Sequence, residues 1–294
     1  MSAILILLVL SPLGIEANGA RRWLNLGLSV QPAEVAKLCM ILFLASFICK
    51  MGKGIRSPKG FWIVLMMPVP ICVMIWQITN NLSSAIIIFG IAFLMLFVAS
   101  PSYKRFIVLG TVGVAAAAAL VFVILQMDSS SLDFRGNRIL AWLNPEDYAS
   151  GTGFQTLQAL YAIGSGGIFG KGLGQSIQKL GFVPEAQNDM IFSVICEELG
   201  LFGAVLLILM FMFVIYRFMV IAGNAPDLMG ALLVVGVMAH IGIQVILNVA
   251  VVTNTIPNTG VTLPFISYGG TSVLFLMCEM GLVLSVSNQI KLET

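Results

Sequence analysis

Long apolar runs, separated by short polar stretches, recur along almost the whole chain. A helix needs about 20 apolar residues to cross a bilayer core roughly 30 Å thick. The runs predict spans near residues 33–50, 61–78, 82–100, 105–126, 189–219, 226–252 and 267–288. The stretch Ala3–Leu13 is too short to cross, and we interpret it as the outer half of a helix. The pattern predicts an all-α polytopic membrane protein with about seven full spans and one partial N-terminal helix, forming a single transmembrane domain over residues 1–294.

Composition supports this class and excludes several others. The 294 residues are 59% hydrophobic and 10% charged, whereas soluble domains carry about 25% charged residues. A net charge of +2 gives no support for a nucleic-acid partner. The five cysteines lie in apolar spans without a CxxC motif, and the chain has one histidine, which excludes thiolate and histidine metal centres. Magnesium bound by carboxylates stays open.

Basic residues in the short loops predict the orientation of the chain. They gather on one side, which the positive-inside rule makes cytoplasmic, while the short loops of the other side hold Arg21 and Arg22. The cytoplasmic group consists of Lys50, Lys53, Arg56, Lys59, Lys104, Arg105, Arg217 and Lys291. The long segment 127–188 is therefore expected to be an extracytoplasmic loop, and Asp189 follows it on the same side.

The long segment 127–188 carries structure of its own. The sequence predicts two short amphipathic helices in it, Phe134–Leu143 and Phe154–Ile163, which could lie in the membrane interface. A glycine-rich stretch follows, but the P-loop pattern fails because Lys171 precedes Gly172 rather than serine or threonine. We interpret these glycines as backbone packed closely against a lipid-like ligand or a neighbouring helix.

Asp189 stands where this polar segment gives way to the apolar run of residues 190–222. An aspartate at that point either caps the helix, by binding its unpaired amides, or is a reachable catalytic carboxylate. Glu197 and Glu198 lie deeper in the same run, where an uncompensated charge costs several kcal/mol. We expect these two side chains to be protonated or hydrogen-bonded structural groups.

Two further polar sets fall within predicted spans. Glu34 and Lys37 are three residues apart on one helical face, and form either a self-neutralising ion pair or the wall of a cavity in which Lys37 meets an anionic substrate. His240, Gln244 and Asn248 recur every four residues on one helix. They form either an interhelical hydrogen-bond seam or a cavity wall.

Several stretches resemble the SEDS family, which comprises FtsW, RodA and SpoVE. They are GARRWLNLGLSVQPAEVAKL at 19–38, residues 144–203 with GKGLGQSIQKLGFVPEAQND, and NTGVTLPFISYGGTS at 258–272. The resemblance runs in order along nearly the whole chain and is closer to the FtsW/SpoVE branch. Family members have ten helices, so we expect this chain to begin within the third and to lack the first two.

The resemblance implies a peptidoglycan glycosyltransferase of cell division or sporulation, in the bacterial cytoplasmic membrane. Its substrate would be lipid II, an undecaprenyl-diphosphate-linked disaccharide peptide polymerised outside that membrane. Its partner would be a class B penicillin-binding protein, the transpeptidase that cross-links the strands. Two alternatives stay open: a transporter that flips lipid II, and a non-catalytic scaffold for the penicillin-binding protein.

The resemblance also implies roles for particular residues. Asp189 follows Pro184-Glu185-Ala186-Gln187-Asn188, which is similar to the family's PEAHTD-like motif, and is the catalytic candidate. It would be the general base for an acceptor hydroxyl or would bind a divalent cation, Mg or Mn, at the diphosphate. The candidate substrate-binding residues are Glu34 and Lys37, which match the family's QPSExxK motif, with Arg22, Lys171 and Lys179.

Overall fold

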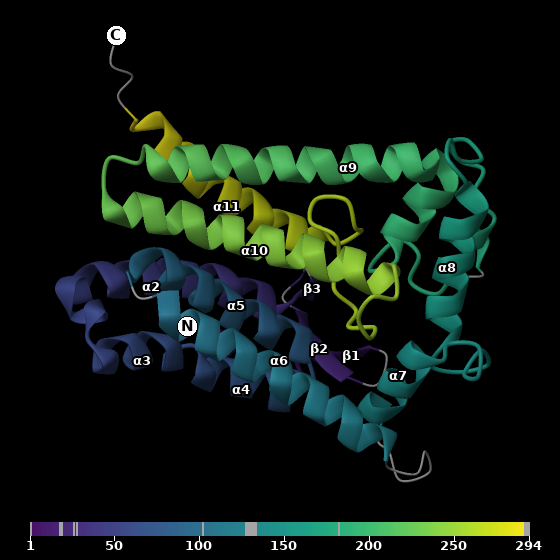
Figure 1. Cartoon of the computed structure of the whole chain (residues 1–294), viewed down its shortest axis with the longest axis horizontal. Coiled ribbons are helices and arrows are strands. Elements are labelled where there is room, and N and C mark those ends of the chain that lie inside the picture. Colours follow the sequence, from purple (N-terminus) through teal and green to yellow (C-terminus); the bar gives the residue numbers. More distant parts are fainter. Residues whose placement is uncertain are drawn as a thin grey trace. The chain divides into compact units, whose positions relative to one another are not determined.

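The computed structural model describes residues 2–17, 20–25, 27, 29–101, 103–126, 134–181 and 183–290. Lys291, of the predicted cytoplasmic group, lies outside the described residues, as do residues 127–133 of the predicted outer loop. The described part contains seven helical segments long and apolar enough to cross a membrane, which confirms the predicted class (Figure 1). These segments are Pro32–Arg56, Pro58–Thr79, Leu82–Ala99, Tyr103–Leu125, Ile191–Gly223, Leu228–Val252 and Gly270–Asn288.

The chain divides into two compact units, which are described separately. The first comprises Met1–Pro101, Phe211–Gln244 and Gly269–Thr294. Its own helices are α1 (Ser2–Leu8), α2 (Pro32–Met51), η1 (Gly52–Arg56), α3 (Pro58–Met66), α4 (Val69–Thr79), α5 (Leu82–Ala99) and α11 (Gly270–Asn288). Both α2 and α4 pack against α5, and Ile41, Leu44 and Ile91 are buried in this core (Figure 1).

Local sequence signals explain where these helices begin and end. Pro32 occupies the first turn of α2, where its missing N–H costs nothing. The side chain of Asn81 accepts a hydrogen bond from the Ser84 amide and so caps α5. The predicted span 61–78 is broken into α3 and α4, because Pro68 and Pro70 lack the N–H groups that would continue the helical ladder.

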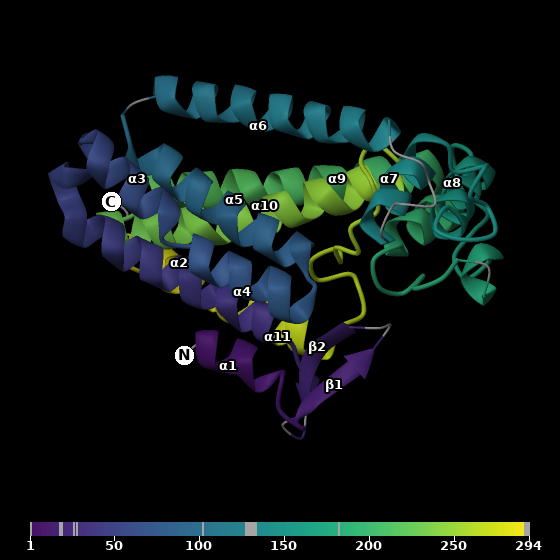
Figure 2. The same ribbon diagram turned by 90° about the horizontal axis from the view of Figure 1, so that it is seen from below.

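A small antiparallel sheet in the first unit was not predicted. Strands β1 (Gly14–Ala17), β2 (Ala20–Asn25) and β3 (Ser29–Val30) pair in the order β1-β2-β3 beside α1 (Figure 2). The strands have four, six and two residues, too short for an alternating pattern to stand out beside the apolar runs. Arg22, a candidate substrate-binding residue, lies on β2.

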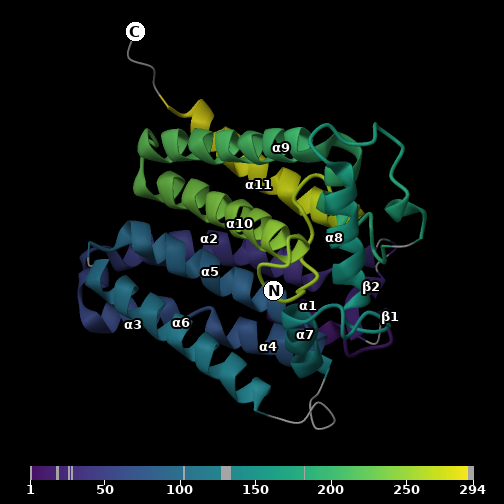
Figure 3. The same cartoon turned by 45° about the vertical axis from the view of Figure 1, so that its right-hand side comes forward.

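The second unit comprises Ser102–Met210 and Val245–Tyr268. It contains α6 (Tyr103–Leu125), α7 (Phe134–Leu143), α8 (Phe154–Gly166) and η3 (Gln178–Leu180), and α9 (Ile191–Gly223) and α10 (Leu228–Val252) supply residues to both units. Helices α7 and α8 confirm the two short helices predicted after α6 (Figure 3). The Trp142 indole donates to the Asn254 carbonyl at 3.0 Å, which ties α7 to the segment after α10.

Helix α9 consists of two helices that meet at Gly200, where φ is 67° and ψ is −167°. The glycine-rich stretch binds the backbone exposed at this break: Lys171 N donates to the Glu197 carbonyl at 3.0 Å, and Leu201 N donates to the Gly167 carbonyl at 2.9 Å. A Cβ on Gly170 or Gly200 would collide with the opposite backbone, so the close approach requires glycine. The interpretation of these glycines as backbone packed against a neighbouring helix is confirmed.

Candidate functional site

Asp189 lies two residues before α9 and is 8% exposed. Its carboxylate atom Oδ1 accepts a hydrogen bond from Nε2 of Gln155, on α8, at 3.2 Å. Among the described residues, no amide of the first turn of α9 is seen to donate to this carboxylate. The geometry therefore favours a carboxylate held by α8 over a helix cap.

The backbone around Asp189 is fixed by the end of α10 and the segment that follows it. Nδ2 of Asn248 donates to the carbonyls of Asp189 and Val261, both at 2.7 Å. The Ser267 hydroxyl donates to the Asn188 carbonyl at 2.6 Å. Asn248 thus acts in a hydrogen-bond seam, one of the two interpretations of its helix.

The surroundings of Asp189 change its acidity. Burial raises the pKa of the carboxyl to about 6, and the negative charge of Glu185 acts in the same direction. The backbone N–H of Asp189, the Arg138 guanidinium and the Gln155 hydrogen bond oppose this rise in pKa. A carboxyl with a pKa of about 6 is mostly ionised at neutral pH and is a stronger base than an ordinary aspartate, a property that suits a general base.

A pocket of about 220 Å³ has Gln155 in its lining. Its lining comprises Arg138, Gly151, Thr152, Phe154, Gln155, Pro184 and Asn258. Arg138 also donates to the Asn258 carbonyl at 3.2 Å, which joins α7 to the segment after α10. The pocket offers a cation and side-chain amides, groups that suit hydroxyl-rich and anionic ligands.

Gln155, Arg138 and Asn258 were not among the residues selected from the sequence. Gln155 and Asn258 do fall within the stretches that resemble the SEDS family, at 144–203 and 258–272. That resemblance was the signal by which these two residues could have been found. Neither side chain is ionisable and neither interrupts an apolar run, so composition and hydropathy do not mark them.

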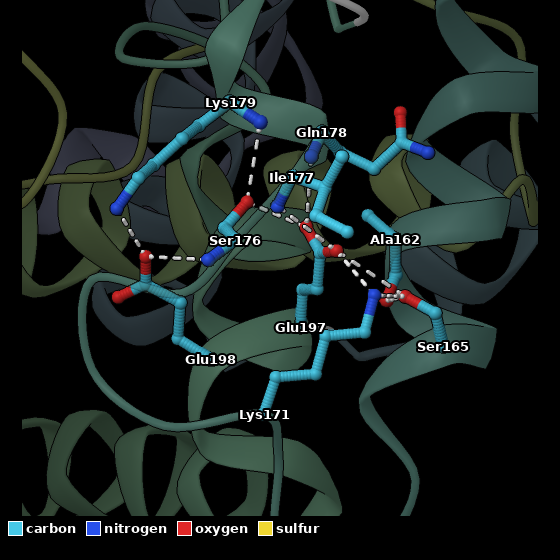
Figure 4. Close-up of polar contacts among 9 residues, drawn as sticks. All are labelled: Ala162, Ser165, Lys171, Ser176, Ile177, Gln178, Lys179, Glu197 and Glu198. Atoms are coloured by element: carbon cyan, nitrogen blue, oxygen red, sulfur yellow. Dashed lines mark hydrogen bonds and ion pairs between the residues drawn. The ribbon is translucent and has the colours of Figure 1, made fainter.

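Lys171 and Lys179 bind glutamates of α9 (Figure 4). Nζ of Lys171 lies 2.7 Å from Oε1 of Glu197, and Nζ of Lys179 lies 2.5 Å from Oε1 of Glu198. Glu197 also accepts hydrogen bonds from the Ser176 hydroxyl and from the backbone amides of Ile177 and Gln178. Both glutamates are hydrogen-bonded structural groups, as expected, while a substrate-binding role of the two lysines stays a prediction.

The other candidates belong to the first unit. Nζ of Lys37 lies 2.7 Å from Oε1 of Glu34, and the side chains are 1% and 8% exposed, so the predicted ion pair is present and buried. Arg22 donates from Nε to the Thr79 carbonyl and from Nη2 to the Asn80 carbonyl, both at 3.3 Å. Arg22 therefore binds the C-terminal end of α4.

His240 contributes to a seam within the first unit. Its Nδ1 lies 2.8 Å from Oε2 of Glu279 on α11, and both side chains are buried. The interhelical interpretation of this histidine is confirmed, and Glu279 is a paired structural carboxylate.

In the described residues, seven helices are long and apolar enough to span a membrane, and a buried carboxyl of raised pKa lies just before one of them. Together they define a multi-pass membrane protein with a candidate acid–base site. The sequence model of the FtsW, RodA and SpoVE family, described as "Cell cycle protein", matches residues 1–292. The chain belongs to this family.

Curated relatives and solved structures agree with this assignment. The chain is 40% identical to stage V sporulation protein E of Bacillus subtilis, over 97% of this chain and 76% of that protein. It is 38% identical to a probable peptidoglycan glycosyltransferase FtsW of Geobacter metallireducens, over 98% of this chain and 75% of the relative.

Among solved structures, one is described as "Structural coordination of polymerization and crosslinking by a peptidoglycan synthase complex". It is similar with a TM-score of 0.79 and 28% identity, covering 99% of this chain and 80% of that chain. The crystal structure of the rod shape determining protein RodA of Thermus thermophilus gives a TM-score of 0.64 and 28% identity, over 99% of this chain and 77% of that one.

Proposed function

We propose that the protein is a peptidoglycan glycosyltransferase that polymerises lipid II during cell division or sporulation, with Asp189 as its general base. The observation that carries the proposal is the Asp189 carboxylate, which is buried, raised in pKa to about 6 and held through one oxygen by Gln155. The glycosyltransferase names of several relatives support the same chemistry.

The proposed reaction joins two glycan units. Asp189 takes the proton of the acceptor sugar hydroxyl, whose oxygen attacks the anomeric carbon of the donor. The bond between that carbon and the diphosphate breaks, and undecaprenyl diphosphate leaves with the bonding electrons. Cationic side chains would stabilise the departing charge, and Lys37 and Arg22 stay the candidates for this role from the family resemblance.

A divalent cation, Mg or Mn, stays a prediction from the family resemblance. No cluster of three His, Cys, Asp or Glu side chains able to hold a metal occurs in the described part of the chain. Near Asp189, the side-chain oxygens of Gln155 and Asn258 already accept hydrogen bonds. These residues do not form a complete site for a divalent ion, and the proposed reaction uses no metal step.

We further propose a class B penicillin-binding protein as the partner. The support is the similarity to the solved peptidoglycan synthase complex, which concerns polymerisation and crosslinking together. In such a pair, the strand made by one protein is the substrate for crosslinking by the other.

The functional test is a polymerisation assay in liposomes that contain the protein, a penicillin-binding partner and lipid II. We expect glycan polymer, resolved as a ladder on a gel. Lipid II that crosses the membrane without forming polymer would contradict the proposal in favour of a transporter. Partner binding without either activity would contradict it in favour of a scaffold.

We propose that residues 127–189 face the exterior of the bacterial cytoplasmic membrane, because the basic loops mark the opposite side as cytoplasmic. In a variant without native cysteines, an impermeant maleimide should label Gln187→Cys on intact cells. The matched control Lys53→Cys should react only after lysis; both side chains are exposed. The reverse pattern would contradict this orientation.

A further inference from the structure

We propose that Gln155 is a positioning residue that occupies Oδ1 of Asp189, so that Oδ2 is the atom that takes the acceptor proton. This inference rests on the proposed function. It identifies which oxygen of Asp189 reacts. It also gives roles to two side-chain amides: Gln155, which contacts Asp189, and Asn258, which contacts Gln155.

The inference begins at a backbone amide whose hydrogen-bonding role is fixed. Gly260 N donates to Oδ1 of Asn258 at 3.1 Å, and a backbone N–H can only donate. The Asn258 atom that faces it must therefore be the oxygen, which turns Nδ2 of the same amide toward Gln155. Nδ2 donates to Oε1 of Gln155 at 2.9 Å.

The same logic fixes the Gln155 amide. Its oxygen faces Asn258, so its Nε2 faces Asp189, where it donates to Oδ1 at 3.2 Å. Nε2 also donates to the Pro184 carbonyl at 3.2 Å, and a carbonyl can only accept. The hydrogen bonds from Gly260 N through Asn258 and Gln155 to Asp189 form a relay. The Gly260 amide at one end and the Pro184 carbonyl at the other independently specify the same orientation of its two side-chain amides.

A donor fixed on Oδ1 determines where a proton can be added. Nε2 of Gln155 has no acceptor capacity, so Oδ1 must present a lone pair to it whether Asp189 is charged or neutral. The hydroxyl oxygen of a carboxylic acid accepts a hydrogen bond more weakly than its carbonyl oxygen, so protonation at Oδ2 keeps the stronger acceptor facing Gln155. Oδ2 is accordingly the oxygen that gains and loses the proton.

Space for one atom lies beside Oδ2, at the position that a Cβ of Gly260 would take. A Cβ placed on Gly260 would lie 3.6 Å from Oδ2, and Gly260 has a φ of +67°, which side chains rarely adopt. A glycine at this position therefore keeps the space beside Oδ2 free of a side chain. Gly260 also supplies the N–H that begins the relay, so one residue serves both requirements.

The charged groups acting on Asp189 are Arg138 of α7 and Glu185 of the preceding turn. The contacts with Asp189 from α8 and α10 come from the neutral amides of Gln155 and Asn248. Removing the Gln155 donor leaves these two charges in place, so its effect on Asp189 can be measured separately.

The test is a pH titration of the Asp189 carboxyl by infrared spectroscopy in the wild-type protein and in Gln155→Leu. Each spectrum is measured as the difference against the matching protein that carries Asp189→Asn. We expect the midpoint to move up by about one pH unit, because the charged form loses a hydrogen bond. The C=O stretch of the protonated carboxyl should move to higher wavenumber, since the carbonyl oxygen Oδ1 loses its donor. The acid limb of the polymerisation rate should move by the same amount as the midpoint.

Two further variants secure the result. Gln155→Glu keeps the shape of the side chain and should also raise the midpoint, because it adds a like charge. Gln158→Leu is the matched control on α8, with a half-buried side chain, and should leave midpoint and stretch unchanged. An unchanged midpoint or stretch in Gln155→Leu, with Gln155→Glu also unshifted, would overturn the proposal. Because the infrared signals need no activity, an inactive protein would sink the proposed function without deciding this inference.

Discussion

Polymerisation of lipid II should fall by about 10²–10⁴-fold when Asp189 is replaced by asparagine, the usual contribution of a general base. The carboxamide has nearly the same size, and its oxygen can still accept the hydrogen bond from Gln155. It cannot take a proton, so chemistry is lost while the local structure is kept. The rate is measured with saturating lipid II and the partner protein, and folding by the thermal unfolding midpoint in detergent.

Asp147→Asn is the matched control for this variant. Asp147 is an exposed carboxylate between α7 and α8, and its replacement changes the net charge by the same amount. We expect Asp147→Asn to polymerise at the wild-type rate. If Asp189→Asn also polymerised at the wild-type rate, Asp189 would be a structural residue.

The second large effect is expected at the buried pair of Glu34 and Lys37. The variant Lys37→Met leaves the Glu34 carboxylate, 8% exposed, without the ammonium group that neutralises it. Breaking a buried pair in this way should lower the free energy of unfolding by about 3–5 kcal/mol. Unfolding in detergent monitored by circular dichroism measures this change.

The double variant Glu34→Gln, Lys37→Met separates the two interpretations of this pair. It removes both charges, so most of the lost stability should return. If Lys37 also contacts the diphosphate, as the family resemblance implies, the polymerisation rate should stay low in the double variant although its stability is restored. Recovery of both stability and rate would show that the pair is structural alone.

The sequence predicted the spanning helices well because a membrane demands long apolar runs, and such runs are visible without knowledge of the fold. It did not predict the break between α3 and α4 or the kink at Gly200. Both breaks leave the apolar composition unchanged. The kink also depends on hydrogen bonds from the backbone of residues 167–172. The hydrophobic pattern of residues 190–222 alone carries no information about that contact.

The candidate site was predictable in part. Glu34 and Lys37 are three residues apart, so helical geometry alone brings them together. Asp189 was selected through its place at the mouth of an apolar run and through its motif. The relay from Asn258 to Gln155 joins residues 103 positions apart, and only the folded chain shows that contact.

The most direct test of Asp189 as general base is the rate of lipid II polymerisation by the wild-type protein as a function of pH. The base works only when ionised, so the rate should rise with pH to half its plateau near pH 6, the pKa of the Asp189 carboxyl. The residual rate of Asp189→Asn should show no such rise. A wild-type rate that is independent of pH between about 5 and 8 would contradict the account.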